Sequence, residues 1–145
     1  MPEHFFIINK KEKDMKNPKI LIIDDEPEIL ILVKSRIEAN GYKGVTANSG
    51  KTGIELAKKE KPNVILLDLL MPEMDGYEVM KKLKSDKETA GIPVILFTAA
   101  PPEEVTKKGG KVMEAVDFVI KPFDEKALLF LINRISDMTS DEKMD

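Results

Sequence analysis

The sequence predicts a doubly wound α/β fold, in which a five-stranded parallel sheet of order 2-1-3-4-5 carries five helices on its two faces. Short apolar runs alternate with helical patterns along the 145 residues, and this alternation is typical of parallel strands joined by helical crossovers. Several runs are apolar without interruption, as strands covered on both faces are. Right-handed crossovers leave few topologies, and the expected order has a switch point between the first and third strands.

Composition excludes several classes of function. The chain has no cysteine and one histidine, His4, so it holds neither a disulfide framework nor a multi-histidine zinc site. The formal charge of −3 argues against a dedicated nucleic-acid binder. No apolar run is long enough to cross a membrane. We therefore expect a soluble cytoplasmic protein that contacts neither nucleic acid nor membrane directly.

The chain length suits one domain. Residues 1–17 combine a short apolar stretch with four lysines, and we expect a flexible basic leader there. The alternative is that Phe5 and Phe6 dock on the domain or on a partner. Residues 18–138 form the expected domain, and residues 139–145 form an expected polar tail.

The first strand is expected at residues 19–24, where an apolar run ends on an acid. An acid before Pro27 is a helix-start signal. Apolar residues then recur at helical spacing, and Asn40-Gly41 is a stop signal.

The next three elements follow from similar signals. A shorter strand is expected at residues 43–47, and Ser49-Gly50 opens a second helix that ends before Pro62. The third strand is expected at residues 63–68, where a branched apolar run ends on Asp68.

The second half of the chain repeats the alternation. A third helix is expected at residues 76–84 and a fourth strand at residues 94–98. Pro101 begins a fourth helix, which Gly109-Gly110 interrupts at a cost of about 1 kcal/mol per glycine. A fifth strand at residues 116–120 precedes the last helix, whose apolar residues share one stripe.

Polar residues stand where the predicted strands end. Asp24 and Asp25 end the first strand, Asp68 ends the third, Thr98 ends the fourth and Lys121 ends the fifth. Parallel strands end along one edge of a sheet and lie roughly 4.8 Å apart. We therefore expect the three acids to converge beside the switch point, with the long lysine side chain reaching toward them from about 10 Å away.

Three neighbouring carboxylates repel one another and favour a hard cation. Oxygen ligands of this kind suit Mg²⁺. Beside a cation Asp68 stays ionised and can attack as a nucleophile. Lys121 and Thr98 are then expected to bind the oxygens of an incoming phosphoryl group. Each residue alone has a structural explanation, as a helix cap, a strand end or a surface lysine, but the combination favours phosphoryl chemistry.

These motifs resemble the response-regulator receiver domains of two-component signalling, of the chemotaxis-regulator type. The resemblance covers about residues 18–138. It rests on a combination of four sequence motifs. They are Asp24-Asp25 after an apolar strand, Asp68 with Met-Pro-Glu-Met-Asp-Gly following at residues 71–76, Thr98-Ala99, and Lys121-Pro122-Phe123.

The resemblance implies a flavodoxin-like fold and a role for each residue. Asp68 would be the phosphoacceptor. Asp25, Asp68 and the backbone carbonyl of Leu70 would bind Mg²⁺ directly, and Asp24 would act through water. Thr98 and Phe118 would form the switch, unless Phe118 is an ordinary strand residue. The switched face would combine the helix after Pro101, the strand at 116–120 and the last helix.

The resemblance also implies partners. We expect a stand-alone receiver that accepts phosphate from a histidine kinase or a histidine phosphotransfer protein and signals to a downstream effector protein. It would be no enzyme beyond its own phosphorylation and dephosphorylation. Two alternatives remain: an Mg²⁺-dependent aspartyl-phosphate phosphatase, and a scaffold module that is never phosphorylated. A flavin or nucleotide binder lacks the glycine-rich or hydroxyl-rich loop it would need.

Overall fold

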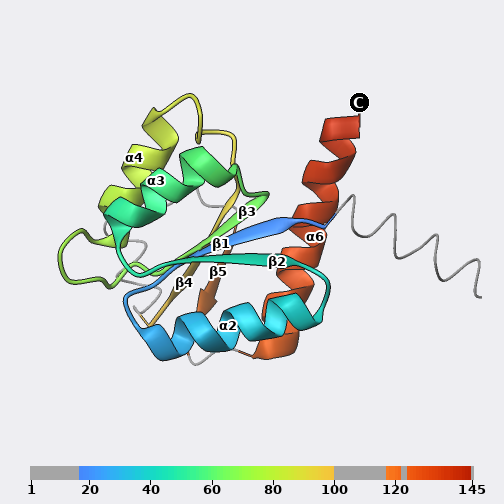
Figure 1. Ribbon diagram of the computed structural model, residues 1–145, viewed down its shortest axis with the longest axis horizontal. Coiled ribbons are helices and arrows are strands. Elements are labelled where there is room, and N and C mark those ends of the chain that lie inside the picture. Colours follow the sequence, from blue (N-terminus) through green and yellow to red (C-terminus); the bar gives the residue numbers. More distant parts are fainter. Residues whose placement is uncertain (1–16, 100–116, 122–123, 145) are drawn as a thin grey trace, which may run out of the picture.

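Five parallel strands form one sheet in the order β2-β1-β3-β4-β5, as the sequence predicts (Figure 1). The structure is a computed structural model that describes residues 17–99, 117–121 and 124–144. The strands are β1 Lys19–Ile23, β2 Lys43–Ala47, β3 Val64–Leu67, β4 Val94–Thr98 and β5 Asp117–Ile120. The described helices are α2 Pro27–Ala39, α3 Gly50–Glu60, α4 Gly76–Ser85 and α6 Glu125–Met144.

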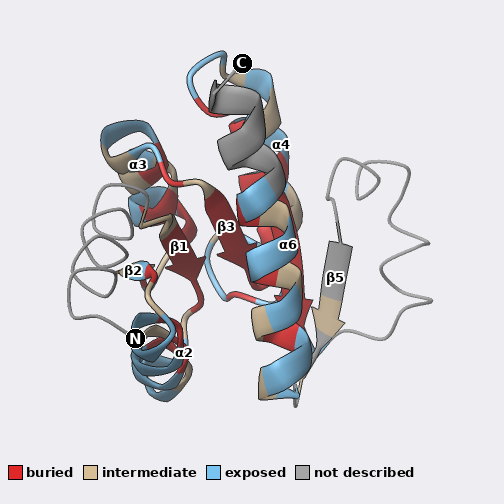
Figure 2. Ribbon diagram, turned by 90° about the vertical axis from the view of Figure 1, so that its right-hand side faces the viewer, coloured by how far each residue is buried: buried red, intermediate tan, exposed pale blue. Residues whose placement is uncertain are grey.

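The central strands are buried on both faces because successive side chains point to opposite sides of a strand. In β1, Leu21 and Ile23 pack in the core beneath α3 and α4, whereas Ile20 and Ile22 pack in the core beneath α2 and α6. Figure 1 shows these two helix pairs on opposite sides of the sheet, and Figure 2 shows β1 and β3 as buried strands between them. A central strand therefore contributes side chains to two cores, one on each face of the sheet, and this explains why its sequence is apolar without interruption.

The helices α3 and α4 begin where the sequence predicts them. The Ser49 hydroxyl accepts a hydrogen bond from the Thr52 N–H at the start of α3. The Asp75 carboxylate does the same for the Glu78 N–H at the start of α4. These side chains satisfy backbone donors that have no partner within the first helical turn.

The last helix extends into the segment for which we expected a polar tail. The predicted domain stops at residue 138 and a polar tail follows, but α6 continues to Met144. Residues 139–144 contain neither glycine nor proline, so no local signal ends the helix there. Four of the five predicted helices lie in the described part of the chain. None of these four helices is both long and apolar enough to cross a membrane.

Several predictions concern residues outside the described ranges. These are the leader up to residue 16, the helix that begins at Pro101 and its Gly109-Gly110 interruption. Phe118, the predicted switch residue, lies on β5, opposite Leu96 of β4, but its side chain is also outside the described set.

Tyr42, just before β2, contacts α6, and its ionisation makes the stability of the fold sensitive to alkaline pH. Its buried hydroxyl donates to the Asn133 side-chain oxygen at 2.8 Å. Burial, with the nearby Asp137 charge, raises the pKa of Tyr42 to about 12. The folded state therefore holds this proton more tightly than the unfolded chain does, and the stabilisation is lost as pH rises from about 10 through about 12.

We expect this shift to appear in an absorbance titration of the Tyr77→Phe variant, in which Tyr42 is the remaining tyrosine. Its phenol should ionise close to pH 12 in the folded protein, and near pH 10 in denaturant. An ionisation near pH 10 without denaturant would contradict the assignment.

Candidate functional site

The polar residues at the sheet edge are fixed by backbone hydrogen bonds to neighbouring strands. The Asp24 N–H donates to the Ala47 carbonyl at 3.1 Å, and the Asp68 N–H donates to the Ile23 carbonyl at 3.0 Å. The Lys121 N–H donates to the Thr98 carbonyl at 2.8 Å. Each residue thus continues the ladder by one position past its strand, which places its side chain at the carboxyl edge of the sheet.

Asp24 is the most deeply buried acid of the site. Its side chain is fully buried, and Oδ1 accepts a hydrogen bond from the Glu26 N–H at 2.9 Å. A short acidic side chain that binds the backbone two residues ahead closes a tight turn. This turn ends β1 and leads into α2, so Asp24 is held by local structure as well as by the sheet.

Asp68 lies beside Asp24 and is 2% exposed. Its Oδ1 accepts from the Leu70 N–H at 3.1 Å. The loop that follows returns to the site, because the Gly76 N–H donates to the Leu69 carbonyl at 3.0 Å. The nucleophile expected from the sequence is thus held in place at the end of β3.

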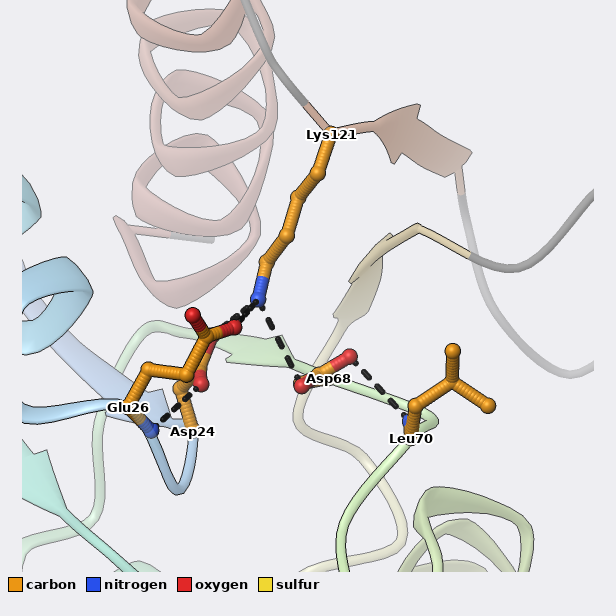
Figure 3. A network of polar contacts seen from close by, with 5 residues as sticks. All are labelled: Asp24, Glu26, Asp68, Leu70 and Lys121. Atoms are coloured by element: carbon orange, nitrogen blue, oxygen red, sulfur yellow. Dashed lines mark hydrogen bonds and ion pairs between the residues drawn. The ribbon is translucent and has the colours of Figure 1, made fainter.

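Lys121 joins the two buried acids (Figure 3). Its Nζ lies 2.5 Å from Asp24 Oδ2 and 3.4 Å from Asp68 Oδ2. The same Nζ lies 4.9 Å from the centre of the Phe97 ring, within the range of a cation–π contact. The side chain reaches past β4 and β3 to the end of β1, which is farther than the spacing of the strands alone suggested.

Burial sets the protonation preferences of these groups. Burial raises the pKa of Asp68, the neighbouring Asp24 charge adds to this, and the Leu70 N–H and Lys121 offset part of it. Burial likewise raises the pKa of Asp24 against the opposing effect of Lys121. Burial alone would lower the pKa of Lys121, but its hydrogen bond to Asp24 and the charges of Asp68 and Asp24 outweigh it and raise that pKa.

The oxygen atoms of this cluster fit a hard cation. Carboxylate oxygens of Asp24, Asp25, Glu26 and Asp68 all lie within 4.8 Å of one another. Two of these acids are buried, and Lys121 is their shared cationic neighbour. Crowded carboxylates with raised pKa values are stabilised by a divalent ion, and an all-oxygen set suits Mg²⁺.

The structure brings most of the predicted site residues together. Asp24, Asp25, Asp68 and Lys121 form one cluster. Thr98 is fully buried at the end of β4, the strand next to β3. Leu70 lies two residues after Asp68 and exposes 48% of its surface. Their proposed roles in metal binding and switching stay predictions.

Glu26 is a site residue that we did not predict, because in the sequence it reads only as part of a helix start. It occupies the position before α2, yet its side chain makes no capping hydrogen bond. Instead its Oε1 lies 3.3 Å from Lys121 Nζ. The run of three acids from Asp24 to Glu26 was the sequence signal that could have pointed to Glu26 as a site residue. Its partner became known only from the position of Lys121 in the structure.

Comparison with known families agrees with this geometry. Residues 20–133 match the family described as the response regulator receiver domain. This range contains all the residues of the acidic cluster and, apart from Lys19 at the start of β1, every strand of the sheet.

Two relatives illustrate the range of matches. The chain is 38% identical over 117 residues to the protein PilH of Pseudomonas aeruginosa, and the match covers 81% of this chain and 96% of PilH. It is also 38% identical over 110 residues to the alkaline phosphatase synthesis transcriptional regulatory protein PhoP of Bacillus subtilis. That match covers 76% of this chain but only 45% of PhoP.

Solved structures share the fold. The chemotaxis protein CheY4 of Vibrio cholerae superposes with a TM-score of 0.74 at 30% identity, over 82% of this chain and 98% of that one. The receiver domain of the Francisella response regulator 1452 has a TM-score of 0.75 at 32% identity, over 85% of this chain and 99% of that one.

Proposed function

Because this chain belongs to the response regulator receiver domain family, we propose that Asp68 is the phosphoacceptor of a two-component signalling pathway. The observation that carries the proposal is the contact of one lysine with two buried carboxylates. Lys121 Nζ reaches both Asp24 and Asp68, so an ammonium group stands beside the carboxylate that would accept the phosphoryl group.

In the proposed reaction, an Asp68 carboxylate oxygen attacks the phosphorus of a phosphohistidine on a kinase or phosphotransfer protein. The new oxygen–phosphorus bond forms as the phosphorus–nitrogen bond breaks, and the departing imidazole keeps the electron pair and takes up a proton. Lys121 would bind one phosphoryl oxygen and balance its charge. The Leu70 N–H holds the Asp68 carboxylate in position for attack.

The acidic cluster would hold Mg²⁺, with Asp25, Asp68 and the Leu70 carbonyl as direct ligands and Asp24 acting through water. When bound, the ion supplies positive charge to the phosphoryl oxygens. The protein contribution is the arrangement of the oxygens. The buried Asp24 stays anchored by the Glu26 N–H, and the partly exposed Asp25 is accessible to the ion.

The proposed output is a population shift between two conformations of the domain. Thr98 would move toward the phosphoryl group and Phe118 would turn inward behind it, which would change the face that contains β5 and α6. A downstream effector protein would read this face. Apart from catalysing its own phosphorylation and dephosphorylation, the chain would not act as an enzyme, and the cytoplasmic location expected from the sequence stays a prediction.

The phosphatase alternative lacks support in this site. Such an enzyme usually needs a second acid two residues after the nucleophile, and Leu70 occupies that position with an apolar, half-exposed side chain. A scaffold that is never phosphorylated would not need a lysine held against the two buried acids.

Labelling with a small phosphodonor tests the proposal. With Mg²⁺ and phosphoramidate, we expect the intact mass of the protein to rise by one phosphoryl group, and we expect excess EDTA to prevent the rise. The reason is that the crowded acids repel an anionic donor until a cation offsets their charge. Equal labelling with EDTA would contradict the proposed metal requirement, and no labelling under either condition would favour the scaffold hypothesis.

A further inference from the structure

We propose that Glu26 is a positioning residue that clamps Lys121 in the resting state and must release it before the ammonium group can bind a phosphoryl oxygen. This inference rests on the proposed phosphoacceptor function of Asp68. It assigns a regulatory role to an acid that the sequence presents only as the start of a helix.

The ammonium group of Lys121 is fully engaged in the resting structure. An ammonium carries three N–H donors and no acceptor. Three carboxylates surround it, because Nζ lies 2.5 Å from Asp24, 3.3 Å from Glu26 and 3.4 Å from Asp68. Only 11% of the lysine side chain is exposed. A phosphoryl oxygen can therefore gain a hydrogen bond from Lys121 only if one carboxylate gives up its own.

Glu26 is the partner that can leave at least cost. Asp24 is fully buried, and both of its carboxylate oxygens accept hydrogen bonds. Asp68 is the group that would be phosphorylated, so Lys121 must stay beside it. The Glu26 side chain is 53% exposed, and water can replace the lysine as its partner without burying a charge.

The surroundings of Glu26 allow this movement. A groove of about 540 Å³ lies beside the site, and its lining includes Glu26, Lys121 and the α2 residues Ile29 and Leu32. The Glu26 side chain makes no capping hydrogen bond to α2, so the helix does not depend on its position. Rotation of the side chain toward the groove would free one N–H of Lys121 and move a negative charge away from the incoming phosphoryl group.

Two substitutions separate a clamp from simple charge repulsion. Glu26→Gln keeps the size of the side chain and removes its charge. Glu26→Asp keeps the charge but shortens the side chain by one methylene, and an aspartate at this position is favoured to cap α2 instead. Since the Glu26–Lys121 contact is already 3.3 Å long, the shorter acid would not hold the lysine. Glu28→Gln is the matched control, because Glu28 is exposed in the first turn of α2.

The experiment measures initial rates of phosphorylation by phosphoramidate, each at the Mg²⁺ concentration that saturates that variant. We expect Glu26→Gln and Glu26→Asp to be phosphorylated roughly twofold to fivefold faster than the wild type, the range expected for a half-exposed ion pair. The Glu28→Gln variant should match the wild type.

Three other outcomes would overturn the clamp, and one of them would also overturn the phosphoacceptor function. If Glu26→Asp reacts at the wild-type rate and Glu26→Gln reacts faster, Glu26 acts through its charge alone and the clamp is wrong. Rates for both variants that equal the wild-type rate also refute the clamp, while the labelled wild type would still support the phosphoacceptor function. If the wild type and both variants stay unlabelled, the phosphoacceptor function and the clamp fall together.

Discussion

The Asp68→Asn variant is expected to lose phosphorylation by phosphoramidate and Mg²⁺, by roughly a hundredfold or more, because an amide is not a nucleophile at neutral pH. Peptide mass spectrometry of the wild type should locate the label on Asp68. Asp75→Asn is the matched control, since Asp75 is an exposed helix cap and asparagine caps helices equally well. Equal labelling of Asp68→Asn and the wild type would refute the assignment.

The same variant should be folded, and more stable than the wild type without Mg²⁺. Burial raises the pKa of Asp68, so the folded state binds this proton more tightly than the unfolded chain does. Ionisation therefore lowers the free energy of unfolding as pH rises through the folded pKa toward neutrality. Asparagine avoids this cost, and a gain of about 1 kcal/mol would raise the melting temperature by about 4 °C. A melting temperature below that of the wild type would contradict the expected gain in stability.

The Gly76→Ala variant is expected to lose about 2–3 kcal/mol of unfolding free energy, as overpacked sites do. A Cβ at Gly76 would lie 2.5 Å from the Leu69 Cα and would also clash with the Asp68 carbonyl oxygen. Both contacts are with backbone, which cannot rotate away. The start of α4 would be pushed from the loop that follows Asp68, so phosphorylation should also slow.

Gly91→Ala provides the control for the effect of an added methyl group. A Cβ at the exposed Gly91 meets no atom within 4 Å, so the free energy of unfolding should change little. Urea denaturation of the two variants measures the difference. Equal stabilities would show that the loop after Asp68 adapts to a side chain at Gly76.

Much of the fold follows from patterns that are local in the chain. Short apolar runs located the five strands, and their alternation with helical segments predicted the order that the sheet has. Ser49 marked the start of α3 correctly because capping involves neighbours within one turn. The sequence did not locate the end of α6, since a polar composition alone does not stop a helix that has no glycine or proline.

The arrangement of the candidate site also follows partly from the sequence and partly from the tertiary structure. The sequence was sufficient to bring Asp24, Asp25 and Asp68 to one edge, because parallel strands end together and neighbouring strands have a constant spacing. The partners of Lys121 were decided by tertiary structure, since its flexible stem could extend in several directions from the end of β5. The buried charges at the end of β1 attract it across the sheet, and that position gives Glu26 a partner and the Asp68 carboxylate its cation.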